Sequence, residues 1–149
     1  MLWLALHFPF LPLEALCARS PSDPEVAAGE AGGAVVVVRG RVMAADARAL
    51  AAGVQPGQKL STALGLAPGL AVSERDEARE HATLEQLACW AGQFTPTVCP
   101  VPPATLLLEI GGCRRLFGGF APLVEAALAD CRGQGFAPLW SVAPTPLGA

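Results

Sequence analysis

The side chains that most often carry catalysis do not form a familiar set in this sequence. It contains no Ser/His/Asp arrangement with recognisable spacing, no HExxH zinc motif and no GxxxxGK[ST] phosphate loop. Two glycine pairs, Gly111-Gly112 and Gly118-Gly119, stand seven residues apart and could cradle a phosphate. The simpler interpretation is that both pairs form tight turns. These motifs by themselves name no reaction.

Candidate metal ligands are few and scattered. The histidines are His7 and His81, and the odd number of cysteines includes no CxxC pair. A structural zinc site needs four ligands close together. We therefore expect no metal or other cofactor, and reduced thiols of the kind that cytoplasmic proteins carry. The cysteines are Cys17, Cys89, Cys99, Cys113 and Cys131.

Four other polar features have both a chemical and a structural interpretation. His7 beside an apolar run is better explained as a packed or strand-end histidine than as a ligand. Glu109 stands alone in an apolar strand, either as a single metal ligand or as a solvated strand end. The acidic run Glu74–Glu85 is typical of a solvated helix face. Arg114-Arg115 could contact phosphate, although adjacent arginines are common on loops.

The elements that must position these residues alternate between short strands and short helices. Turn chemistry through Ser20–Gly33 predicts a surface loop. Apolar runs on both sides of Arg39-Gly40-Arg41 predict a hairpin, and Asp46 is a plausible N-cap for the helix that follows. In the first half we expect strands at Leu2–Leu6, Ala34–Val38, Val42–Ala45 and Leu70–Val72, and helices at Pro12–Ala18, Asp46–Ala52 and Leu60–Leu66.

The second half begins with the longest predicted helix. Ser73 is the expected N-cap, with Asp76 three residues later as a capping-box-like partner. Its apolar face has helical spacing, and hairpins elsewhere favour an α+β fold with a mainly antiparallel sheet. That apolar face comprises Leu84, Leu87, Ala88 and Ala91, and the later elements are strands at Thr97–Val101, Thr105–Ile110 and Ala137–Val142 and a helix at Pro122–Arg132.

Length and composition restrict the class of protein. With 149 residues, 52% of them hydrophobic, and a mean hydropathy of +0.43, the chain suits one domain or a domain with a small lobe. A net charge of −3 and a pI near 5.3 are not those of a strong independent DNA binder. Leu2–Leu13 lacks a basic flank and contains Pro9, so it does not fit a signal peptide. No run is long enough for a membrane helix, and we expect a cytoplasmic, nucleoid-associated location.

Five segments, in order along the chain, resemble the N-terminal part of Y-family translesion DNA polymerases, and specifically their ImuB-type branch. The resemblance extends from Leu2 to the C-terminus. It implies a palm with a ferredoxin-like βαββαβ antiparallel sheet, formed by residues 1–9 and 70–149, and a small fingers lobe at 10–69. The segments are LWLALHFPFLPLEAL (Leu2–Leu16), ADARALAAGVQPGQKLSTALGLAP (Ala45–Pro68), QFTP (Gln93–Pro96), LLLEIGGCRRLFGG (Leu106–Gly119) and SVAPTP (Ser141–Pro146).

The resemblance also implies that the metal ligands of active relatives are missing. Their two metal-binding aspartate positions match Ala5 and His7, and their Asp-Glu pair matches Ala104 and Thr105. Nucleotidyl transfer uses two divalent cations, and Mg²⁺ needs negatively charged oxygen ligands. Thr105 could offer only a neutral hydroxyl. Glu109 lies about 13 Å further along an extended strand, so it cannot replace the lost carboxylates.

The fingers positions are degenerate in the same way. The Tyr and Arg that hold the incoming triphosphate in active relatives match Ala47 and Leu50. The aromatic ring that excludes ribonucleotides matches Phe10, which is retained but could now simply belong to the core. The resemblance therefore implies a chain without catalytic or nucleotide-binding residues.

The first functional hypothesis is a catalytically inactive scaffold in damage-induced mutagenesis. By resemblance, its partners are an error-prone C-family polymerase, a RecA-like accessory protein and the sliding clamp. The family continues through thumb, little-finger and partner-binding regions, so this chain resembles an N-terminal piece. Two alternatives stay open, namely an active polymerase with substitute ligands and a protein-interaction domain that does not contact DNA. The candidates for DNA phosphate contacts are Arg39, Arg41, Arg48, Lys59, Arg114 and Arg115.

Overall fold

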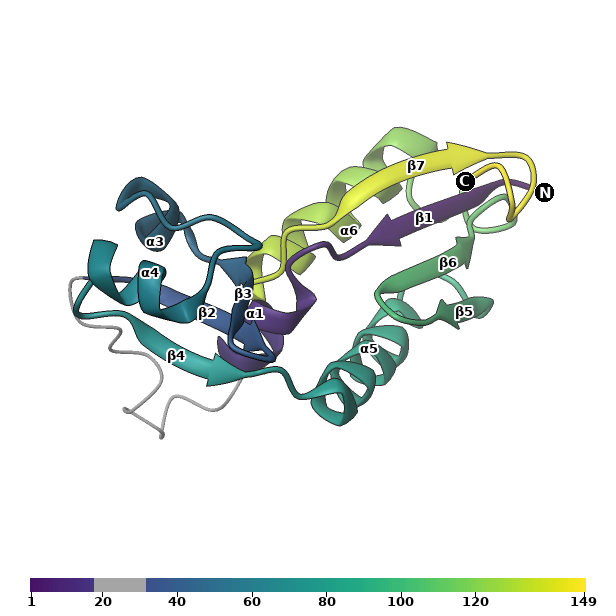
Figure 1. The fold of residues 1–149 in the computed structure, drawn as a ribbon. Coiled ribbons are helices and arrows are strands. Elements are labelled where there is room, and N and C mark those ends of the chain that lie inside the picture. Colours follow the sequence, from purple (N-terminus) through teal and green to yellow (C-terminus); the bar gives the residue numbers. More distant parts are fainter. Residues whose placement is uncertain (18–31) are drawn as a thin grey trace. The chain divides into compact units, whose positions relative to one another are not determined.

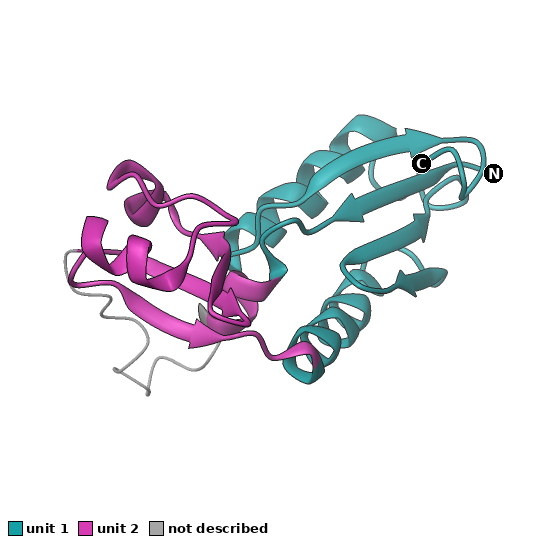
Figure 2. Cartoon of the chain, viewed as in Figure 1, with its two compact units in different colours: residues 1–11, 78–149 teal, residues 12–77 magenta. Residues whose placement is uncertain are grey.

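The computed structural model describes residues 1–17 and 32–149, which form two compact units (Figures 1 and 2). Unit 1 comprises Met1–Leu11 and Ala78–Ala149, and unit 2 comprises Pro12–Glu77. Unit 2 is thus an insertion in the chain of unit 1. Most of the predicted loop Ser20–Gly33 lies outside the described residues, as does the side chain of Cys17.

Unit 1 is a four-stranded sheet with two long helices. Its elements follow the order β1 (Trp3–His7), α5 (Glu77–Ala91), β5 (Val98–Val101), β6 (Thr105–Glu109), α6 (Phe120–Gly133) and β7 (Leu139–Ala143) (Figure 1). The strand order is β5-β6-β1-β7, and every neighbouring pair is antiparallel. This is the βαββαβ arrangement that the sequence predicts, with unit 2 inserted between β1 and α5.

Successive side chains of each strand point to opposite faces of this sheet, so residues two apart share a face. Leu4 and Leu6 of β1, with Leu106 and Leu108 of β6, are fully buried. They pack in one core with the apolar faces of both helices, including the predicted Leu84 and Leu87. The alternate positions, such as Ala5 of β1 and Thr105 of β6, therefore lie on the face away from the helices.

Unit 2 is a smaller three-layer unit. Its sheet has the order β3-β2-β4, with β2 (Ala34–Val38) antiparallel to β3 (Arg41–Ala45) and parallel to β4 (Ala71–Glu74). Val36 packs on one face against α1 (Leu11–Cys17). Val35 and Val37 pack on the other against the region of α3 (Ala47–Ala51) and α4 (Leu60–Leu66). In the described parts of the chain, no helix has the length and apolar character needed to cross a membrane.

The stretch 70–76 differs from its prediction in two respects. Ser73 lies in β4, paired with Val36, and so does not cap the longest helix. The parallel ladder continues to Arg75, whose N–H bonds the Val37 carbonyl at 3.1 Å, and the helix begins only at Glu77. The strand expected at Leu70–Val72 also belongs to the sheet of unit 2 instead of the palm sheet. One edge of β2 has backbone N–H and C=O groups that need hydrogen-bond partners, and β4 supplies them. This pairing with β2 keeps Ser73 in a strand and overrides the local signal for a helix cap.

The predicted N-cap Asp46 is confirmed, and it depends on a close glycine. Its Oδ1 accepts a hydrogen bond from the Ala49 N–H at 2.8 Å. Gly33 has φ +85°, and a Cβ there would lie 2.5 Å from both the Asp46 Oδ1 and the Ala49 nitrogen. Any side chain at position 33 therefore displaces the capping bond as well as straining the backbone.

We predict that Gly33→Ala lowers the free energy of unfolding by about 2 kcal/mol, from positive-φ strain and the lost cap. The control is Gly57→Ala, because Gly57 also has a positive φ of 93° but nothing within 4 Å of an added Cβ. That control should lose only about 1 kcal/mol, from strain alone. Urea unfolding followed by circular dichroism measures both variants, and equal losses would contradict the prediction.

Candidate functional site

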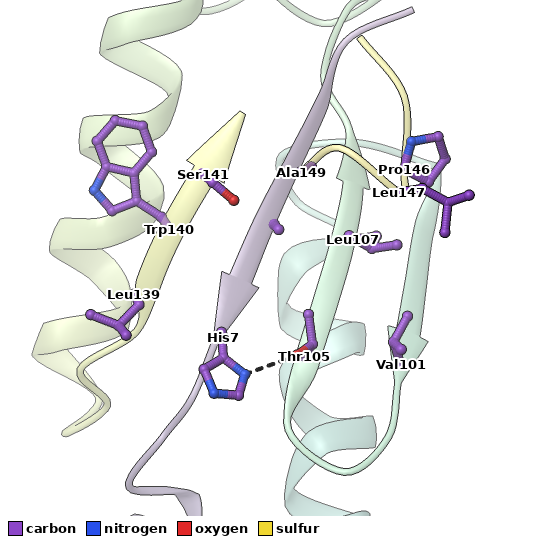
Figure 3. A pocket seen from close by; sticks show the side chains of 11 residues that line it. His7, Val101, Thr105, Leu107, Leu139, Trp140, Ser141, Pro146, Leu147 and Ala149 are labelled. Carbon is purple, nitrogen blue, oxygen red and sulfur yellow. Dashed lines mark hydrogen bonds between the residues drawn. The ribbon is translucent and has the colours of Figure 1, made fainter. Parts of the chain in front are cut away.

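The face of the unit 1 sheet that carries no helix contains a pocket of about 510 Å³ (Figure 3). Its floor consists of alternate residues of three paired strands, since Ala5 faces Leu107 of β6 on one side and Ser141 of β7 on the other. The lining is mostly apolar and includes no side-chain carboxylate. The lining residues are Ala5, His7, Val101, Thr105, Leu107, Leu139, Trp140, Ser141, Pro146, Leu147 and Ala149.

His7 and Thr105 form the main polar contact in this pocket. They face each other across the β1–β6 ladder, and His7 Nδ1 lies 3.0 Å from Thr105 Oγ1 (Figure 3). His7 is exposed at the end of β1, so its interpretation as a strand-end histidine is confirmed. This pair can exchange a hydrogen bond with a ligand, but neither group supplies the anionic oxygen that Mg²⁺ prefers.

Three of the four predicted degenerate positions therefore meet in one pocket. Ala5, His7 and Thr105 line it together, whereas Ala104 does not. The Ala104 side chain instead packs against the core of unit 1, and its carbonyl accepts the Phe8 N–H at 2.8 Å. Among the described residues, no three His, Cys, Asp or Glu side chains gather where a metal ion could bind.

The degenerate fingers positions lie together on α3. Ala47 and Leu50 are three residues apart, so they share one face of this helix. Both are exposed, and Leu50 retains 45% of its accessible surface. Methyl and isobutyl groups can neither donate a hydrogen bond nor carry charge to a triphosphate. Phe10 is 47% exposed, so the alternative that it had become a core residue is wrong.

The structure places three of the six candidate cations around the β2–β3 turn. Arg41 and Lys59 form a β-bridge, and the Arg41 Nη1 donates to the Gly57 carbonyl at 2.9 Å. Arg39 occupies the turn itself with φ 51°, an uncommon conformation for a residue other than glycine. Arg39 shares a surface hollow with three carboxylates, Glu74, Asp76 and Glu77, and with Arg75, which pairs with Glu77 at 3.2 Å. Arg41 and Lys59 are therefore better placed than Arg39 to contact a phosphate.

The other three candidate cations lie elsewhere. Arg48 is on α3, which follows the far end of β3 from this turn, about 13 Å away along the strand. Arg114 and Arg115 are exposed in unit 1, and Arg114 Nε lies 3.4 Å from the Gly111 carbonyl. The six side chains do not form one basic patch within either unit.

Glu109 has a structural role that the sequence only partly revealed. Its Oε1 accepts hydrogen bonds from the Gly111 N–H at 2.9 Å and the Leu2 N–H at 3.3 Å. Burial by itself would raise the pKa of this carboxyl group, but backbone N–H groups and the positive chain terminus outweigh it and lower the pKa. Glu109 therefore ties the 111–112 turn to the start of β1. The glycine pair was the available signal, since a Cβ at Gly111 would lie 2.7 Å from this carboxylate.

Comparison with known sequences identifies the family of this chain. A family model described as the impB/mucB/samB family matches residues 20–149. The chain belongs to this family. It is 34% identical over 99 residues to Protein ImuB of Caulobacter vibrioides, in strain NA1000 / CB15N and in strain ATCC 19089 / CIP 103742 / CB 15. That match covers 57% of this chain but only 22% of the length of these relatives.

Solved structures show the same fold. A ternary complex of Dbh matches all of this chain and 43% of that chain, with a TM-score of 0.73 and 16% identity. DinB from Sulfolobus solfataricus matches all of this chain and 44% of its own, with a TM-score of 0.66 and 17% identity. The predicted α+β fold, a Y-family palm with an antiparallel sheet and a small fingers lobe, is confirmed, as is the ImuB-type resemblance.

We predict that Glu109→Gln destabilises the chain at neutral pH and that the difference disappears in acid. The folded-state pKa of Glu109 lies below its usual value of 4.5. The carboxylate therefore contributes stability above the unfolded-state pKa, and this contribution is lost as the pH falls through the lowered folded-state value. Urea unfolding of both proteins between pH 7 and pH 3 measures this difference. A gap that stayed constant with pH would contradict a role for the charge.

Proposed function

We propose that this chain is the polymerase-like part of a protein that acts in translesion synthesis at damaged DNA without transferring nucleotides itself. The observation that carries the proposal is the pocket on the open face of the unit 1 sheet. Ala5, His7 and Thr105 meet there, where active relatives are expected to hold their metal-binding carboxylates. The fold is that of a polymerase palm, but the pocket offers methyl, imidazole and hydroxyl groups.

The chemistry explains why these substitutions should abolish the reaction. One cation activates the primer 3′-hydroxyl and the other stabilises charge on the triphosphate. Without carboxylates the pocket has no anionic ligand for either ion, and exposed Ala47 and Leu50 give the triphosphate no donor. Losing both contributions removes nucleophile activation and transition-state stabilisation together. No nearby described acid compensates, because Glu109 already binds the backbone of Leu2 and Gly111.

The partners and the location belong to the same proposal. The likeness to ImuB suggests an error-prone C-family polymerase, a RecA-like accessory protein and the sliding clamp as partners, near the nucleoid. We propose that this chain contributes a weak DNA contact through Arg41 and Lys59, whose exposed side chains adjoin each other beside the β2–β3 turn. The net charge of −3 favours a secondary contact of this chain with DNA over a role as the main DNA-binding surface.

A protein-interaction role without DNA contact is the second candidate. The observation that favours it is the apolar surface of the pocket, to which Leu139 and Val101 contribute side chains that are 63% and 39% exposed. Contiguous exposed apolar surface often marks an interface. DNA binding separates the two candidates, because the scaffold proposal includes it and this alternative does not.

We predict that the intact protein extends no primer, with Mg²⁺ or with Mn²⁺, when it is in excess over the template. DNA binding measured in the same samples should remain detectable. Incorporation of a nucleotide would overturn the proposal, since it would require ligands outside the positions described. The variant Ala5→Asp, Ala104→Asp, Thr105→Glu is a companion, because new Mg²⁺-dependent extension by it would trace the inactivity to these positions.

We predict that Arg41→Ala reduces the salt dependence of DNA binding by the intact protein. One lost phosphate contact should lower the slope of log K against log salt by about 0.7–0.9. The charge-matched control is Arg132→Ala, which removes an exposed arginine from the last turn of α6. Fluorescence anisotropy between 50 mM and 200 mM salt measures all three proteins. Equal slopes for all three would remove Arg41 from the interface.

A further inference from the structure

We draw no further inference here: the strongest candidate, the surface patch on the turn between β6 and α6, where Leu116 is 83% exposed beside the exposed Arg114 and Arg115, carries nothing because nothing in the structure shows what covers it.

Discussion

The pairing of β1 with β6 on one side and β7 on the other is the constraint on which the rest of unit 1 depends. Because side chains alternate along a strand, this double pairing commits Leu4 and Leu6 to the core and Ala5 and His7 to the opposite face. A slip of one residue in either register would bury the imidazole and expose two leucines. The same alternation that builds the core therefore also builds the pocket.

The fold was largely predictable because its signals are local. The hairpin around Arg39-Gly40, the Asp46 cap and the bounds of α4 depend on neighbouring residues, and the structure reproduces them. Ser73 was misassigned because its partner, Val36 in β2, lies 37 residues earlier in the chain. A capping signal is worth about 1 kcal/mol, which a continued strand ladder can exceed. The extent of β4 is a tertiary property that the local pattern could not show.

The site was predictable in its residues but not in its geometry. Ala5, His7 and Thr105 were identified from the resemblance, and the β1–β6 register brings them together. Ala104, adjacent to Thr105, packs against the core instead, and the alternation of side chains between the two faces of a strand was the signal that could have shown this. The placement of the candidate cations also depends on tertiary structure. Arg41 and Lys59, for example, meet only through a β-bridge between segments that are separated in the sequence.

Under the proposed inactive role, the apolar pocket also affects the stability of the fold. Carboxylates that share a metal site repel one another when no cation is bound, so an active palm carries a cost in stability for its chemistry. Ala5 between Leu107 and Ser141, and the hydrogen bond between His7 and Thr105, involve no pair of carboxylates and so carry no such repulsion. Under the proposed inactive role, replacing such acids with neutral residues removes this repulsion. What must then be kept is the surface that the sheet presents, and strands β1, β6 and β7 need only their register to present it.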